Sequence, residues 1–232
     1  MRLESQKRLD IRGAVIGGPR PLVCLPLVSA EREGLLTEAA ELVRLGPDLL
    51  EWRFDAYGDA AERGSVADLL PRLRAVIGDL PLIFTCRCPE EGGLGDLSAE
   101  IRLTQLQAAL ASGLVDLVDV EMCNDADLLA TVREAARASG VHLILSHHDF
   151  DATPTEAEII DTLTKAQGLG AQIAKIAVMP RDEADVLTLM AATLKARRSR
   201  LDIPMITIAM AQLGLVSRVA GGCFGSDVTF AS

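Results

Sequence analysis

A lysine inside an apolar segment is the residue of this sequence most suited to covalent chemistry. Lys175 stands in the middle of the run from Ile173 to Val178, which is bounded by Gly170 and Pro180. A short run rich in β-branched residues is typical of a buried strand. Burial lowers the pKa of an amine, and an uncharged amine attacks carbonyl carbon. Taken alone, the pattern favours an ordinary strand-end lysine paired with a carboxylate, so the neighbouring residues must decide.

Charged residues share one face of a second expected strand. Glu51, Arg53 and Asp55 alternate with apolar residues, and three charges on one face cannot pack against helices. We expect this face to line the mouth of a barrel, with a solvated edge strand as the alternative. The same phase predicts inward polar side chains on other strands: Thr85, Arg87, Asp119, Glu121, Ser146 and His148. Among these, Asp119 and Glu121 are the members most suited to a structural ion network.

Two further residues have side chains suited to proton transfer and to anion binding. Neighbouring strand residues point to opposite sides, so the phase set by Ser146 selects His148 over His147 as the inward histidine. A histidine beside an activated lysine can move protons near neutral pH. Arg218 follows the seventh strand-like run, and its planar fork suits a carboxylate. A surface arginine at the end of a short helix explains Arg218 equally well.

The elements that must position these residues alternate along the chain. Eight strand-like runs separated by helical patterns predict an α/β fold, a (β/α)8 TIM barrel. The expected strands are 22–28, 48–55, 81–87, 115–121, 141–148, 173–178, 204–210 and 222–229. The expected helices are 30–45, 66–77, 99–112, 125–139, 155–168 and 181–197, with a short one within 212–219. A doubly wound open sheet is the alternative, although no glycine fingerprint for a dinucleotide is present.

The two ends of the sequence carry separate expectations. The apolar pair Val15-Ile16 and the turn residues Gly17-Gly18-Pro19 predict an N-terminal β-hairpin that closes the bottom of the barrel. After the eighth strand the sequence stops at Ser232 without a final helix. We expect residues 1–232 to form a single barrel domain.

Composition excludes several classes of function. The 232 residues carry a formal net charge of -10, which argues against a nucleic-acid or anionic-membrane partner. No apolar stretch approaches a membrane span and the first ten residues lack a signal-peptide core, which predicts a cytoplasmic protein. The odd number of cysteines, 5, fits reduced thiols, and the 3 histidines show no zinc-ligand spacing with them. Any anionic substrate must therefore meet a local cluster of positive groups.

Six motifs in register along most of the chain resemble type I 3-dehydroquinate dehydratase. The matching segments are Leu50 to Asp55, Phe84 to Arg87 with Glu91 to Gly93, Asp119 to Glu121, Ser146 to Phe150, Ala174 to Ala177, and Ser217 to Gly221 with Phe224 to Ser226. The resemblance implies a lyase of the shikimate pathway, which serves aromatic amino acid biosynthesis. Such an enzyme converts 3-dehydroquinate to 3-dehydroshikimate and water through a lysine Schiff base, as a homodimer and without metal or organic cofactor.

The resemblance also implies a role for each site residue. Lys175 would form the imine with the substrate ketone, His148 would transfer protons, and Glu91 would orient His148. Glu51, Arg53 and Arg87 would hold substrate hydroxyls and the charge network, and Arg218 would bind the substrate carboxylate. A class I aldolase also uses a Schiff-base lysine in a barrel, and a non-catalytic sugar-acid binding protein is an alternative outside the enzymes.

The sequence departs from the family pattern at three places. His147 stands where the family usually has a tyrosine, and Ile208 where it often has a methionine. The family continues into a mobile loop with a serine and a Pro-Gly-Gln segment, followed by a last helix, and neither precedes Ser232. A chain without these parts is expected to bind substrate weakly, because such lids exclude water and complete substrate contacts.

Overall fold

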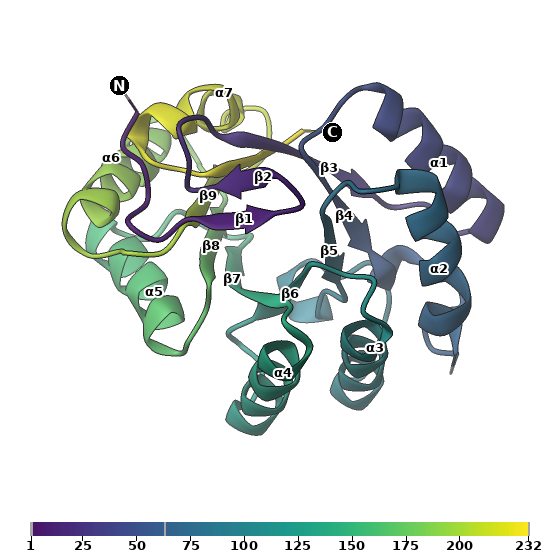
Figure 1. Ribbon diagram of the computed structural model, residues 1–232. Coiled ribbons are helices and arrows are strands. Elements are labelled where there is room, and N and C mark those ends of the chain that lie inside the picture. The colour runs from purple at the N-terminus through teal and green to yellow at the C-terminus, as the bar shows by residue number, and fades with distance from the viewer. Residues whose placement is uncertain (1, 63, 232) are drawn as a thin grey trace. The chain divides into compact units, whose positions relative to one another are not determined.

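The computed structural model describes residues 2–62 and 64–231, which fall into two compact units (Figure 1). Residues 24–143 form one, here called the central unit. Residues 2–23 and 144–231 form the other, here called the terminal unit. The chain passes from one unit to the other within β3 (Leu22–Leu27) and within β7 (His142–Asp149).

Parallel strands and helices alternate in the central unit. From Cys24 onward β3 pairs in parallel with β4, β4 with β5, and β5 with β6. Parallel pairing brings the carboxyl ends of all these strands to one edge, where functional residues gather in α/β folds. The elements after β3 are α1 (Arg32–Arg44), β4 (Leu49–Arg53), η1 (Phe54–Ala56), α2 (Ser65–Ile77), β5 (Leu82–Thr85), η2 (Pro89–Glu91), α3 (Ala99–Ser112), β6 (Leu117–Glu121) and α4 (Ala126–Ser139).

The terminal unit contains a hairpin and the later strands. From Ile144 onward β7 pairs in parallel with β8, and β8 pairs in parallel with β9. The amide of Asp227, just before β10, donates to the carbonyl of Met205 in β9 over 2.7 Å. The elements are β1 (Leu9–Ile11), β2 (Ala14–Ile16), β7, α5 (Glu156–Gly168), β8 (Ile173–Val178), α6 (Glu183–Ser199), β9 (Met205–Ala209), α7 (Leu215–Phe224) and β10 (Val228–Phe230).

An aromatic cluster confirms the predicted phase of β4. The Trp52 ring meets Phe54 and Phe84 edge to face, with centroids 5.1 and 5.6 Å apart. All three side chains are fully buried. Because strand residues alternate between faces, the apolar side of β4 packs into this core while Glu51 and Arg53 take the opposite face.

Helix ends agree with the capping residues in the sequence. The Ser98 hydroxyl accepts the Ile101 amide over 3.3 Å at the start of α3, which spans the predicted residues. The Thr155 side chain and Glu158 form a reciprocal capping box at the start of α5. Gly113 and Gly140 end α3 and α4 with φ of 68° and 70°, a backbone conformation that glycine adopts without steric cost.

The N-terminal hairpin forms, but its predicted turn is wrong. β1 and β2 pair antiparallel around Arg12 and Gly13, whose φ values are 50° and 85°. Positive φ at both central residues matches the right-handed twist of a hairpin, and Asp10 accepts the Gly13 amide. Gly17, predicted in the turn, instead accepts the Ser5 amide through its carbonyl. The hairpin stands beside the residues that lead into β9, because the Lys7 amide donates to the carbonyl of Asp202.

The predicted start of the eighth strand, Gly222, is also wrong. α7 continues through Phe224, and β10 begins only at Val228. Gly222 is a site of close packing within the helix, because a Cβ there would lie 2.6 Å from the Pro21 ring. Gly225, with φ of 116°, ends the helix instead.

The order of elements after the hairpin follows the predicted alternation. Eight strands and seven α-helices succeed one another within the described residues 22–62 and 64–230. Among residues 2–62 and 64–231, no helix combines the length and apolar character needed to cross a membrane.

Candidate active site

Lys175 is buried in the terminal unit, as the sequence predicts. Its side chain, on β8, is 4% exposed, and Ala177 follows it on the same face of the strand. In the β7–β8 register, Lys175 pairs with Ser146 and Ala177 pairs with His148. His148 therefore faces the same side of the sheet as Lys175 and lies two residues nearer the carboxyl end of the strands, where it is half-buried.

A phenylalanine that sequence reasoning did not select faces the lysine. Lys175 Nζ lies 4.5 Å from the centroid of the Phe230 ring, at the end of β10. An aromatic face attracts a cationic amine and offers an apolar wall to a neutral one. The signal available in the sequence was an aromatic residue directly after the expected eighth strand, 222–229, in a chain with only 5 phenylalanines.

Arg218 is tied to the same phenylalanine. Its Nη1 donates to the carbonyl of Phe230 over 2.8 Å, and the Thr229 hydroxyl donates to the carbonyl of Arg218 over 2.8 Å. Burial lowers the pKa of the Arg218 guanidinium, which nonetheless stays charged at neutral pH. The structure thus brings Arg218 and Lys175 together around Phe230 and does not leave Arg218 as a surface residue of α7.

The turn before α7 explains why Arg218 is held so firmly. The Ser217 hydroxyl accepts the Ala209 amide over 2.9 Å and donates to the carbonyl of Gly214 over 2.7 Å. Position 214 must be glycine, because a Cβ there would collide with the carbonyl of Ala209. The first turn of α7 is therefore fastened to the end of β9, and Arg218 follows directly.

In the central unit, the polar face of β4 forms the predicted contacts. The Thr85 hydroxyl donates to Glu51 Oε1 over 2.8 Å, and both side chains are buried. Arg53 donates to both carboxylate oxygens of Asp55 and also to the carbonyl of Gly92 over 3.0 Å. Arg53 thereby connects the end of β4 to the turn that carries Glu91.

The sequence placed Asp55 on the charged face with Glu51 and Arg53 but gave it no role in the site. Besides Arg53, its carboxylate accepts the backbone amides of Arg87 and Leu94, each over 3.0 Å. Burial opposes the charge of Asp55, but Arg53 and these two amides lower its pKa below the ordinary value of 3.8. This carboxylate joins the end of β4 to two places in the connection between β5 and α3.

Arg87 lies in a buried ion network rather than beside open space. Its guanidinium donates to Asp119 over 3.1 Å and to Glu121 over 2.7 Å, and Arg102 of α3 approaches Glu121 at 3.4 Å. Burial raises the pKa of Glu121, and the positive charge of Arg87 opposes that rise. The predicted structural role of Asp119 and Glu121 is confirmed, and the charge of Arg87 is balanced within the protein.

Glu91 is held on a tight turn of the central unit. It is 4% exposed at the end of η2, where the Glu91 and Gly93 amides both donate to the carbonyl of Cys88. A Cβ at Gly93 would lie 2.5 Å from the carbonyl oxygen of Arg87, so this close approach requires glycine. Hydrogen bonding to Glu91 contributes to raising the pKa of the Cys123 thiol, after the larger effect of burial.

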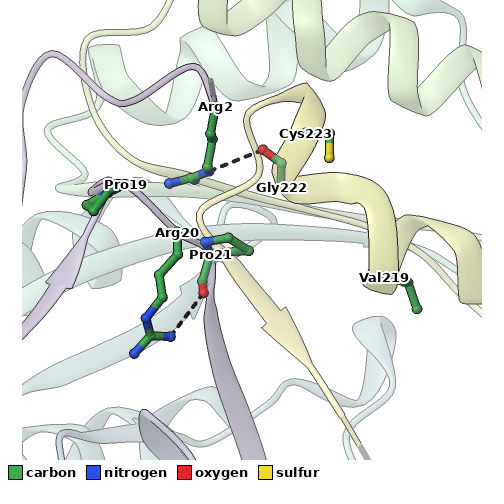
Figure 2. A pocket seen from close by; sticks show the side chains of 7 residues that line it. All are labelled: Arg2, Pro19, Arg20, Pro21, Val219, Gly222 and Cys223. Atoms are coloured by element: carbon green, nitrogen blue, oxygen red, sulfur yellow. Dashed lines mark hydrogen bonds between the residues drawn. The ribbon is translucent and has the colours of Figure 1, made fainter.

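A cavity elsewhere in the terminal unit contains none of the predicted site residues. It has a volume of about 440 Å³ and is lined by Arg2, Pro19, Arg20, Pro21, Val219, Gly222 and Cys223 (Figure 2). The Arg2 guanidinium is occupied there by the carboxylate of Asp227 and by backbone carbonyls that include Gly222. Arg2 therefore has a structural role in the wall of the cavity, and the cavity does not resemble a binding site for the predicted substrate.

Comparison with known proteins decides the family. A model of the type I 3-dehydroquinase family matches residues 23–232. The chain belongs to the type I 3-dehydroquinase family. A 3-dehydroquinate dehydratase of Geobacillus sp. (strain WCH70) is 40% identical over 228 residues, which cover 98% of this chain and 87% of that relative. The predicted enzyme class, type I 3-dehydroquinate dehydratase, is confirmed.

Solved structures of the family confirm the fold class as a (β/α)8 barrel. The type I 3-dehydroquinate dehydratase of Clostridium difficile, solved with covalently modified comenic acid, is 37% identical with a TM-score of 0.95. That match covers 97% of this chain and 89% of the solved one. The Geobacillus kaustophilus dehydratase is 40% identical with a TM-score of 0.95, covering 100% of this chain and 89% of that one.

Proposed function

We propose that this enzyme dehydrates 3-dehydroquinate to 3-dehydroshikimate through a Schiff base at Lys175. The observation that carries the proposal is the buried amine of Lys175, which faces the Phe230 ring at 4.5 Å beside a half-buried histidine on the next strand. A desolvated lysine with an apolar wall is suited to attack a ketone. The covalently modified ligand in the Clostridium difficile structure agrees with covalent chemistry in the family.

The imine changes the reactivity of the substrate. The amine of Lys175 adds to the ketone and water leaves, so the carbonyl becomes an iminium that withdraws electrons from the neighbouring carbon. A C–H bond on that carbon becomes acidic, and its electron pair then expels the hydroxyl one carbon further along. Hydrolysis of the product imine returns the lysine, so the net reaction releases one water.

His148 is the proposed acid and base. It takes the proton from the activated carbon and returns it to the departing hydroxyl, which leaves as water. Its half-buried position one step beyond Lys175 on the neighbouring strand suits both transfers. Glu91 is the proposed residue that orients His148 and tunes its basicity, and its buried carboxylate on a glycine-constrained turn suits a fixed orientation.

Substrate binding is assigned to four charged residues. Arg218 binds the carboxylate of the substrate, because its guanidinium is half-buried, charged and fixed beside Phe230. Glu51 and Arg53 bind substrate hydroxyls, while Arg87 acts through the network it forms with Asp119 and Glu121. A chain with net charge -10 depends on such local positive groups to hold an anion.

Borohydride trapping tests the nucleophile. With 3-dehydroquinate present, borohydride should reduce the imine and attach the ligand to Lys175 in the wild-type enzyme. The Lys175→Ala variant should show no attached ligand and no turnover, whereas Lys165→Ala, which changes an exposed lysine on α5, should behave as wild type. Continued trapping in Lys175→Ala would sink the proposal.

The His148→Ala variant separates proton transfer from imine formation. It should still be trapped by borohydride, while turnover falls by roughly 10²- to 10⁴-fold, the usual contribution of a positioned acid or base. Thermal unfolding of both variants shows whether the loss has a structural cause. Loss of trapping in a well-folded His148→Ala would contradict the division of roles.

We also propose a cytoplasmic location, from the apolar pattern of the sequence, and a homodimer, from the family resemblance. Sedimentation of the purified enzyme measures the assembly directly, and a mass near the 24.7 kDa of one chain would contradict a dimer.

A further inference from the structure

Two cysteines from neighbouring strand ends contact each other in the central unit. Cys88 follows β5 and Cys123 follows β6, and these strands pair in parallel. Their sulfur atoms lie 3.5 Å apart. Closing the disulfide must draw the two sulfur atoms together to the bonded distance of about 2.05 Å, which displaces Cys88 toward Cys123.

The two thiols differ in exposure and in hydrogen bonding. Cys123 is exposed, whereas Cys88 is buried. Burial raises the pKa of both thiols, that of Cys123 to about 11 and that of Cys88 further. The hydrogen bond between the two sulfur atoms lowers the pKa of Cys123 and raises that of Cys88, which favours the Cys123 thiolate. Cys123 is thus the thiol that an oxidant reaches and the one that ionises first.

We propose that Cys88 and Cys123 are a modification site, a dithiol that hydrogen peroxide closes into a reversible disulfide beside Glu91. The Cys123 thiolate attacks one peroxide oxygen, which gives a sulfenic acid and releases hydroxide. The Cys88 sulfur then attacks the sulfenic sulfur, and the oxygen leaves as water with the thiol proton. In sum, two thiols and one peroxide give one disulfide and two waters, and a dithiol reductant reverses the change.

The disulfide acts on the turn that carries Glu91. The carbonyl of Cys88 accepts the Glu91 amide over 3.1 Å and the Gly93 amide over 2.9 Å, so moving Cys88 moves this turn. Oxidation also removes the thiol proton through which Cys123 forms a hydrogen bond to Glu91. The loss of activity rests on the proposed role of Glu91, whereas formation of the disulfide does not.

Peptide mapping tests the bond itself. Purified enzyme is treated with hydrogen peroxide, the remaining thiols are blocked, and the digested peptides are analysed by mass spectrometry. A linked pair containing Cys88 and Cys123 is expected, and it should form faster as pH rises because the thiolate reacts. A Cys86–Cys123 link, oxidation of Cys123 to sulfinic acid with Cys88 still reduced, or two intact thiols would each overturn the proposal.

Matched variants connect the bond to activity. Wild type and Cys223→Ser, which changes an exposed cysteine of the terminal unit, should lose activity roughly tenfold or more on oxidation, as expected for displacing a site residue by about 1 Å. Reductant should restore it. Cys123→Ser, whose hydroxyl can still donate to Glu91, and Cys88→Ala should keep their activity under peroxide. Equal inactivation of these two variants would overturn the link between disulfide and activity.

The outcomes also distinguish this proposal from the proposed catalytic roles. A linked peptide with unchanged turnover would overturn the proposed control of activity by the disulfide and leave borohydride trapping at Lys175 unaffected. Failure of trapping with an intact linked peptide would instead remove the Schiff base and keep the modification site.

Discussion

Phe230 contacts two proposed functional residues, one through its ring and one through its backbone carbonyl. Its ring faces the amine of Lys175, and its carbonyl fixes the guanidinium of Arg218. The distance between nucleophile and carboxylate clamp therefore depends on the position of β10. Substitution of the Phe230 ring should change the surroundings of the Lys175 amine more than the position of the Arg218 guanidinium. The hydrogen bond from Arg218 is to the backbone carbonyl, which survives any side-chain substitution.

Arg218→Met tests the carboxylate clamp. Removing a charge-assisted hydrogen bond of about 1.5–3 kcal/mol should raise KM for 3-dehydroquinate roughly 10- to 100-fold, with a smaller effect on kcat. Arg20→Met removes an exposed positive charge from the cavity in the same unit and is the matched control. An unchanged KM in Arg218→Met, or an equal rise in both variants, would argue against the clamp.

The carboxylate of Asp55 makes the free energy of unfolding depend on pH. Its folded pKa lies below the unfolded value near 3.8, so its stabilisation is fully present above that pH and is lost as pH falls through the folded pKa. Asp55→Asn should cost about 3 kcal/mol of unfolding free energy at pH 7, the usual effect of breaking a buried ion pair. The difference from wild type should shrink as pH falls below 3.8.

Urea denaturation at pH 7 and near pH 3 measures this difference. Asp161→Asn on α5 changes an exposed carboxylate in the same way and should stay within about 0.5 kcal/mol of wild type. The linkage is refuted if Asp55→Asn loses the same free energy at both pH values.

Strand phase predicted contacts between side chains but not those with loop backbone. Alternation along β4 and β5 was enough to expect the Glu51–Thr85 face and the convergence of Arg87 with Asp119. The role of Asp55 depends on amides presented by two loops, and no periodicity describes those loops. For the same reason the sequence indicated Glu91 only through a family resemblance.

At the scale of elements, local signals predicted helices more accurately than the last strand. Ser98, Thr155 and the glycines at 113 and 140 each act within one helical turn, so the sequence contains the whole cause. α7 differs because its Gly222 packs against Pro21, about 200 positions earlier in the chain. A contact so distant in sequence overrides the low helix propensity of glycine.

The capping box of α5 predicts a measurable loss of stability. Thr155→Ala should lower the unfolding free energy by about 1 kcal/mol, because the Glu158 amide loses the Thr155 hydroxyl that accepts its hydrogen bond. Thr162→Ala in the same helix removes only a bond to the carbonyl four residues earlier and should be neutral or slightly stabilising. Urea denaturation compares the two, and equal losses would mean that the box adds nothing.

At the scale of the whole molecule, net charge opposes compaction. The chain carries -10 at pH 7 and approaches neutrality near its pI of about 4.8. Raising sodium chloride from 0.01 M to 0.15 M shortens the Debye length from about 30 Å to about 8 Å. The unfolding free energy should then rise by up to about 1 kcal/mol at pH 7, the size of individual surface charge effects.

The same salt step near the pI is the control. Little change is expected there, because the net repulsion that salt screens is almost absent. Equal increases at both pH values would point to general exclusion of salt from the protein surface instead.

The exposed thiol of Cys223 offers a way to observe substrate binding by fluorescence. It lies on α7, the helix that also carries Arg218, and opens onto the cavity of Figure 2. Of the cysteines that the structure describes, only Cys123 is also exposed, so a Cys123→Ser background directs a maleimide dye to one position. A dye there would report movements of the proposed carboxylate clamp without touching the groups that carry out the reaction.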